Sequence, residues 1–210
     1  MRLHDYWRST ASYRVRIALN LKGLKFEQTP HDLRRGEQRA PDYLHLNPQG
    51  LVPTLQAGDL TLTQSLAIFE WLEERHPSPP LLPTSPDARA IVRSMCEIIA
   101  CDIHPLNNLR VLVALRGEFQ ATEDQVSNWI GQWIASGFAA LETLVARHGQ
   151  GFAFADQPTF ADCCLVPQIY SAERFNVPLT PYPRLVAAVA AARALPAVAA
   201  AHPDRQPGAD

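Results

Sequence analysis

The sequence predicts two domains, an α/β domain followed by an all-helical domain. Over residues 1–78, short strand and helix patterns follow one another in the order βαβ-α-ββα. A Pro-rich stretch comes next, and every later pattern is helical. Such a stretch is stiff and typical of a domain boundary. We therefore expect an α/β domain at 1–78, a linker at 79–86 and an all-helical domain at 87–210.

The composition is that of an ordinary globular protein with ample core. Of the 210 residues, 47% are hydrophobic and 19% charged, and the formal net charge is −2. The sequence contains no Lys/Arg-rich run of the kind that would indicate a nucleic-acid partner. No apolar run approaches the roughly 18 residues of a membrane span, and the first residues read as a strand instead of a signal peptide.

Four cysteines are present, with neither zinc-site nor CxxC spacing; they are Cys96, Cys101, Cys163 and Cys164. The adjacent pair at 163–164 is expected to fill a buried helix face as free thiols. Together these features predict a cytoplasmic protein with no metal site.

The first elements form a βαβ unit. A strand at 2–6 is followed by a helix at 12–22, which Gly23 is placed to end, and by a strand at 24–28. Because a helix joins the two strands, they should be parallel. A short helix is expected at 41–45.

An antiparallel hairpin and a helix complete the α/β domain. Strand patterns at 51–56 and 60–63 flank the turn Gly58-Asp59, and a helix begins at Ser65. Pro53 stands at the start of its strand, where proline is tolerated. The peptide bond before it can be cis or trans.

The second domain should contain six helical segments and a loose end. Pro105 breaks the first pattern, and the pairs Thr122/Gln125 and Thr159/Asp162 have the spacing of capping boxes. The tail at 202–210 is expected to be loose. Helical patterns cover about 87–103, 106–118, 122–147, 159–174, 183–193 and 196–201. The apolar face of the longest is assigned to the core: Val126, Trp129, Ile130, Trp133, Phe138, Leu141 and Leu144.

The segment YWRSTASYRVRIAL at 6–19 is the strongest candidate for a site. It runs from a strand into a helix through clustered hydroxyls, any of which can cap the helix: Ser9, Thr10 and Ser12. Hydroxyls and the cation of Arg8 at a helix N-terminus suit a negatively charged ligand. The alternative is an ordinary polar cap. Arg14 and Arg16, inside the helix, are interpreted as structural.

Five segments in order resemble the zeta class of the glutathione transferase superfamily. The segment at 6–19 resembles the class signature around its catalytic serine. The other four are LNPQGLVPTL (46–55), TQSLAIFEWLEE (63–74), DIHPLNNLRVL (102–112) and SAERFNVPLTPYP (171–183). The resemblance implies a thioredoxin-like first domain and the helical second domain of this family. The S-S-C of the signature becomes Ser9-Thr10-Ala11, and the departure that matters is Ala11, which stands where the family has cysteine.

The resemblance also implies a set of site residues. Ser9 matches the catalytic serine, with Thr10 in reserve, and Arg8 lies beside it. Glutathione would contact Ser9, Gln49, Val52, Pro53, Gln64, Ser65, His104 and Asn108. Three arginines are candidates to bind substrate carboxylates: Arg8, Arg110 and Arg174. For each residue the alternative is structural: a helix cap, a strand-entering proline, a histidine at a helix kink, or a surface arginine.

The activity implied is glutathione-dependent cis–trans isomerisation of maleylacetoacetate or maleylpyruvate. Glutathione would act as cofactor by thiolate addition, bond rotation and elimination. Two alternatives are a transferase that conjugates or dehalogenates small electrophiles such as α-halo acids, and a non-catalytic glutathione-binding protein. The family also implies a homodimer.

Overall fold

A computed structural model describes residues 1–210, which divide into two compact units. The N-terminal unit comprises Met1–Leu81 and Arg193–Asp210, and the helical unit comprises Leu82–Ala192. The division falls inside the Pro-rich stretch. It differs from the expected helical domain of 87–210 because the last residues of the chain pack with the first ones.

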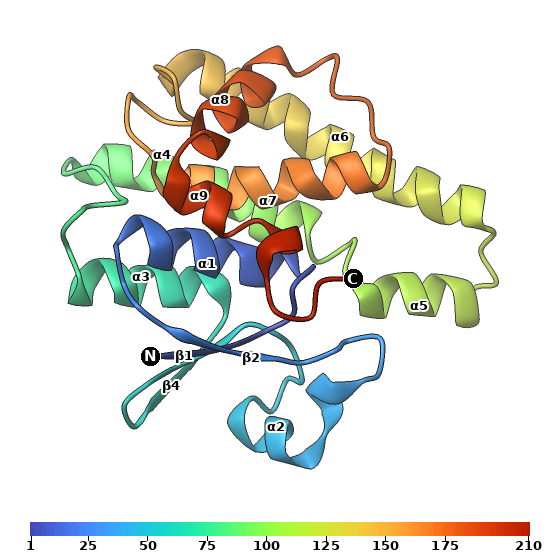
Figure 1. The fold of residues 1–210 in the computed structure, drawn as a ribbon. Helices are drawn as coiled ribbons and strands as arrows, with labels where there is room; N and C mark the ends of the chain where they lie inside the picture. The colour runs from blue at the N-terminus through green and yellow to red at the C-terminus, as the bar shows by residue number, and fades with distance from the viewer. The chain divides into compact units, whose positions relative to one another are not determined.

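The N-terminal unit is built on a four-stranded sheet of order β2-β1-β3-β4 (Figure 1). β1 and β2 are parallel, which confirms the βαβ prediction, and the other two pairings are antiparallel. The strands are β1 (Arg2–Asp5), β2 (Glu27–Pro30), β3 (Thr54–Ala57) and β4 (Leu60–Thr63). The helices are α1 (Thr10–Leu21), η1 (Glu37–Arg39), α2 (Pro41–Leu46), α3 (Ser65–Arg75), α9 (Pro196–Ala200) and η3 (Pro203–Arg205).

Helices cover both faces of this sheet. α1 and α3 pack side by side over one face, and α2 lies on the opposite side (Figure 1). The core between α1, α3 and the sheet consists of apolar side chains with no exposed surface: Leu3, Ile17, Leu55, Ile68 and Leu72. Burial of such side chains contributes about 1.5–3 kcal/mol each.

The strand expected at 51–56 begins only at Thr54. Side chains of α2 and its C-terminus hold the preceding residues: Tyr43 Oη and Asn47 Nδ2 donate to the Leu51 carbonyl at 2.6 and 2.7 Å. The Leu51 carbonyl therefore accepts its hydrogen bonds from side chains. The Val52–Pro53 peptide bond is cis.

The C-terminal tail is not loose, contrary to expectation. The fully buried Arg16 donates from Nε to the Ala201 carbonyl at 3.1 Å. Gln28 Nε2 of β2 donates to Gln206 Oε1 at 3.0 Å. Buried polar groups need such partners, so the tail is fixed by the polar groups of α1 and β2. Arg16 also donates to Asp5 Oδ2 at 2.9 Å, which confirms its structural interpretation.

The helical unit contains α4 (Pro86–Glu97), the π-helical segment η2 (Ile98–Ile103), α5 (Leu109–Gly117), α6 (Glu123–His148), α7 (Phe160–Arg174) and most of α8 (Pro183–Arg193). η2 packs against α6 and α7, and α4 packs against α7. Both predicted capping boxes are present, at Thr122/Gln125 and Thr159/Asp162. No helix is both long enough and apolar enough to span a bilayer.

The buried face of α6 is rotated from the predicted one. Its buried side chains are Val126, Ile130, Ile134, Phe138, Leu141 and Val145. Trp129 and Trp133 are only half-buried, as is Leu144. The Trp129 indole lies at the flank because its Nε1 donates to the Leu106 carbonyl at 2.9 Å. Cys163 and Cys164 form no disulfide and are fully buried in α7, as predicted.

Candidate active site

The ends of three strands lie at one edge of the sheet. His4 of β1 pairs with Thr54 of β3, and Thr54 pairs with Thr63 of β4. Because both pairings are antiparallel, β1 and β4 finish at this edge and β3 begins there. The segments that contain Ser9, Val52–Pro53 and Ser65 therefore leave the sheet at one edge, although they are far apart in the sequence.

Ser9 is the N-cap of α1, which begins at Thr10, two residues before the predicted start. Its Oγ accepts a hydrogen bond from the Ser12 N–H at 3.2 Å. A hydroxyl has one donor and two acceptor positions, so this bond leaves the Ser9 proton available to donate. Ser9 is half-buried, whereas Thr10 is buried in the first turn. The geometry therefore favours Ser9 over Thr10 as the group that meets a ligand.

The guanidinium of Arg8 contacts an aromatic ring but has no hydrogen-bond or ion-pair partner. Its guanidinium lies 5.2 Å from the centre of the Trp7 ring and makes no hydrogen bond or ion pair. The Trp7 carbonyl accepts from Arg16 Nη2 at 2.9 Å, which fixes the turn between β1 and α1. Arg8 is therefore positioned to bind a carboxylate.

Val52 presents a free backbone. Neither its N–H nor its carbonyl makes a hydrogen bond within the protein. Tyr43 and Asn47 hold the neighbouring Leu51 carbonyl. Burial raises the pKa of the Tyr43 phenol, so the phenol stays protonated and continues to donate. A free backbone donor and acceptor suit the backbone of a peptide ligand.

The N-terminus of α3 has no side-chain cap. Its N-cap residue, Gln64, has φ +67° and turns its side chain to donate to Gln49 Oε1 at 2.6 Å. The hydroxyl of the first helical residue, Ser65, accepts from Arg14 Nη1 at 3.3 Å. Uncapped amides, the helix dipole and a nearby guanidinium together favour a carboxylate ligand.

Arg14 contacts a predicted site residue, a contact that the sequence patterns did not predict. Its guanidinium is almost wholly buried and donates to the Ser65 hydroxyl. This buried contact agrees with the interpretation of Arg14 as structural. The available signal for such a contact was its place in a mainly apolar helix, because a buried arginine needs polar or charged partners.

The remaining candidates lie in the helical unit. His104 follows η2, and Asn108 is the N-cap of α5, where its Oδ1 accepts from the Arg110 N–H at 3.1 Å. The Arg110 side chain is exposed. Arg174 ends α7, with its guanidinium 5.8 Å from the Tyr170 ring and 5.1 Å from the Phe175 ring. The structure thus groups three of these residues at the η2–α5 connection and places Arg174 at another helix end.

Comparisons with known proteins agree with this arrangement. Family models described as glutathione S-transferase N-terminal domain and C-terminal domain match residues 1–74 and 123–200. A relative from Pseudomonas aeruginosa named maleylacetoacetate isomerase is 51% identical over 99% of this chain and 98% of its own length.

Two solved structures are similar over the whole chain. A holo structure of maleyl pyruvate isomerase, described as a bacterial glutathione S-transferase in the zeta class, has 48% identity and a TM-score of 0.98, with full coverage of both chains. Maleylacetoacetate isomerase from Methylobacterium extorquens AM1, with bound malonate and glutathione, has 40% identity and a TM-score of 0.96, again with full coverage. The chain belongs to the glutathione S-transferase family, in its zeta class.

Proposed function

We propose that this protein catalyses the glutathione-dependent cis–trans isomerisation of maleylacetoacetate or maleylpyruvate. The observation that carries the proposal is the sheet edge at which the Ser9, Val52–Pro53 and Ser65 segments leave the sheet. Its relatives with these two names are similar along the whole chain, which supports the same activity here.

The residues at this edge suit glutathione. The uncapped amides of α3 and the Ser65 hydroxyl would bind the α-carboxylate of the γ-glutamyl group, with Gln64 and Gln49 beside them. The free N–H and carbonyl of Val52, held before Pro53, would pair with the peptide backbone. His104 and Asn108 are further proposed contacts, which rest on the resemblance. When bound, glutathione supplies the sulfur nucleophile for reversible addition to an activated cis double bond.

Ser9 is the proposed catalytic residue. Its hydroxyl proton would donate to the thiolate, and the amides of the first turn of α1 add positive potential there. Thr10, whose side chain is buried, remains the reserve candidate. Arg8 would bind a substrate carboxylate and stabilise negative charge as it develops. Arg110 and Arg174 are also proposed to bind substrate carboxylates, and this proposal rests on the resemblance alone.

The proposal extends to assembly and location. We propose a homodimer in the cytoplasm. Exposed apolar side chains support a partner surface on the helical unit, because Leu109 and Val113 lie four residues apart on α5 and are 48% and 58% exposed. Light scattering coupled to size-exclusion chromatography tests the mass, and Val113→Lys should shift it towards the monomer if this face is the interface.

A parallel assay on both maleyl substrates tests the function. We expect isomerisation of at least one substrate, dependent on glutathione, with free thiol constant throughout the reaction. Stoichiometric loss of free thiol would identify a conjugating transferase instead. Glutathione binding without turnover of either substrate would identify a binding protein. Comparison of the two rates also tests which substrate is compatible with alanine at position 11.

A further inference from the structure

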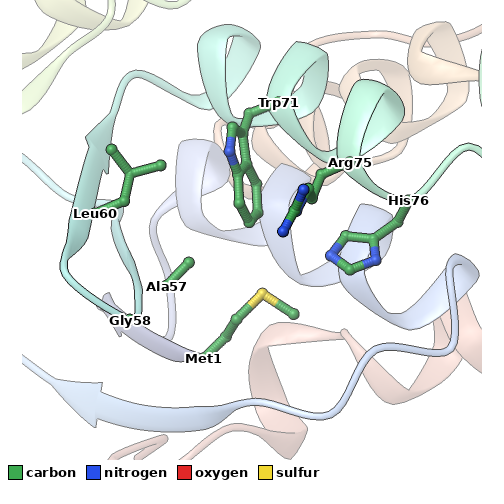
Figure 2. A pocket seen from close by; sticks show the side chains of 7 residues that line it. All are labelled: Met1, Ala57, Gly58, Leu60, Trp71, Arg75 and His76. Carbon is green, nitrogen blue, oxygen red and sulfur yellow. The ribbon is translucent and has the colours of Figure 1, made fainter.

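A cavity of about 520 Å³ opens on the N-terminal unit, away from the candidate active site (Figure 2). It lies between the β3–β4 hairpin and the C-terminal half of α3, whereas the candidate site lies at the opposite end of the hairpin. Ligand pockets in proteins have volumes of roughly 300–1,000 Å³, so this cavity is large enough for a small molecule.

The two walls of the cavity differ in chemistry. Trp71, Arg75 and His76, from α3 and the residue after it, form one wall, and Figure 2 shows the three side chains on the same side of the cavity. Apolar side chains form the other wall: Met1, Ala57 and Leu60. No acidic side chain lines the cavity. The lining therefore combines a cation, an aromatic face and an apolar surface.

Arg75 has no partner in the protein. It is exposed, and its guanidinium makes neither a hydrogen bond nor an ion pair. The neighbouring rings are ordered, because Trp71 and His76 meet edge to face with their centroids 5.9 Å apart. A free guanidinium beside an indole suits a carboxylate attached to a planar ring, since guanidinium binds carboxylates bidentately and indole stacks on aromatic rings.

The walls are held in place before any ligand binds. The buried Lys22 donates from Nζ to the His76 carbonyl at 2.7 Å, which fixes the end of α3. Ala57 and Leu60 are paired across the hairpin turn. A backbone N–H of β2 donates to the Met1 carbonyl at 3.0 Å. A pre-formed site loses little conformational entropy on binding.

We propose that this cavity binds a planar aromatic monocarboxylate. The ring lies against Trp71 and faces Leu60, and the carboxylate pairs with Arg75 beside His76. Arg75 is the one arginine or lysine side chain of the lining, so the proposal assigns it one carboxylate. A second carboxylate on the same ligand would face the apolar wall, where it would lose hydration without gaining a partner.

Calorimetric titration with 2-naphthoate, in the presence of saturating glutathione, tests the proposal. We expect saturable binding that Arg75→Gln weakens about tenfold and Trp71→Leu about fivefold. The neutral probe 2-naphthamide should bind more weakly than 2-naphthoate, and Arg75→Gln should leave its affinity unchanged. Arg147→Gln, which removes an exposed arginine of the helical unit, is the matched control for net charge and should change neither affinity.

A second variant tests the opposite wall. Leu60→Asp places a carboxylate across from Arg75, at a position that is 43% exposed and tolerant of a polar side chain. It should weaken 2-naphthoate more than 2-naphthamide. Isomerase activity should be unchanged in the Arg75, Trp71 and Leu60 variants, because none of these residues belongs to the proposed active site.

The indole N–H signals in a ¹H–¹⁵N spectrum locate the probe. The chain has four tryptophans, and Trp7 lies next to Arg8. The signal absent from the Trp71→Leu variant should shift on titration, and the Trp7 signal should not. A shift of Trp7 alone, an affinity that Arg75→Gln does not change, or an absence of saturable binding would each overturn the proposal.

Discussion

The N-termini of α1 and α3 lie in the same unit. Their unpaired backbone N–H groups differ in whether a side chain caps them. At α1, the Ser9 side chain caps the helix by accepting from the Ser12 N–H. At α3, the Gln64 side chain turns away from the helix to Gln49, and no side chain caps the amides. A buried guanidinium, that of Arg14, reaches the first hydroxyl of α3 instead.

This difference separates two kinds of anion site. At α1 the hydroxyl is fixed by its own helix, with one proton left to donate, which suits a single sulfur atom. At α3 several amides remain, which suits the two oxygens of a carboxylate. Substitutions should therefore separate catalysis at α1 from cofactor binding at α3. The capping box of α7, where both partners are satisfied internally, provides a purely structural reference.

The largest effect is expected for Ser9→Ala. Loss of the hydroxyl donor should lower kcat/KM by a factor on the order of 10²–10³. The free energy of unfolding should fall by only about 1 kcal/mol, because one helix cap is removed. Steady-state kinetics and urea denaturation measure the two effects. An isomerisation rate equal to that of the wild type would show that Ser9 is not the thiolate partner.

Asp162→Asn should lower stability by about 2 kcal/mol without changing the affinity for glutathione. Oδ1 of Asp162 accepts from the Ala153 N–H at 2.8 Å, and Oδ2 accepts from the Thr159 N–H and hydroxyl at 2.8 and 3.1 Å. In the variant, an amide NH₂ group must face one of these donors. Urea denaturation at neutral pH measures the change.

The same substitution should remove a pH dependence. Burial raises the pKa of Asp162 from near 3.8 to about 6. Between these values the folded state holds more protons than the unfolded state, so the wild-type free energy of unfolding should fall as pH rises through this window. The stabilisation that comes from the raised pKa of Asp162 is fully present below pH 3.8 and lost above pH 6. The Asp162→Asn variant should lack this stabilisation. The control is Thr122→Ala at the exposed capping box of α6. In this variant the free energy of unfolding should depend on pH as it does in the wild type.

Ser65→Ala should raise the KM for glutathione about tenfold, with little change in kcat. In the proposed binding mode, the Ser65 hydroxyl contacts a carboxylate that is remote from the reacting sulfur. A glutathione analogue with 4-aminobutyrate in place of the γ-glutamyl group lacks this carboxylate, so its KM should be the same in wild type and variant. A fall in kcat as large as that of Ser9→Ala would contradict the separation of roles.

The smallest effect is expected for Thr10→Ala. Its side chain is buried in the first turn of α1, behind the N-cap. We expect kcat/KM to change by less than about threefold and the free energy of unfolding to fall by about 1 kcal/mol, as for many buried methyl deletions. A loss of activity comparable to that of Ser9→Ala would transfer the catalytic role to Thr10.

Local patterns predicted much of the fold. The βαβ unit, the hairpin turn at Gly58-Asp59, the start of α3 at Ser65 and the two capping boxes all depend on residues close in sequence. The candidate residues on the sheet edge were found through the resemblance, and their grouping follows from strand register. Register depends on which strands pair, and the sequence patterns alone specified only part of that pairing.

The errors involve partners that lie outside the segment whose structure was predicted. The first strand of the hairpin starts late because Tyr43 and Asn47 hold the Leu51 carbonyl. The tail is ordered because Arg16 needs the Ala201 carbonyl. Propensity and periodicity describe one segment at a time, so they contain no information on these contacts. The contact between Arg14 and Ser65 was not predicted for the same reason, since Ser65 lies on another helix.

The contact between Arg16 and Ala201 also affects the order in which the protein can fold during synthesis. The ribosome makes β1, α1 and the rest of Met1–Leu81 first, but these residues form one compact unit with Arg193–Asp210. Until residue 201 emerges, the guanidinium of Arg16 lacks a carbonyl that it binds in the finished fold. The first segment translated therefore reaches its final structure only after the helical unit has left the ribosome.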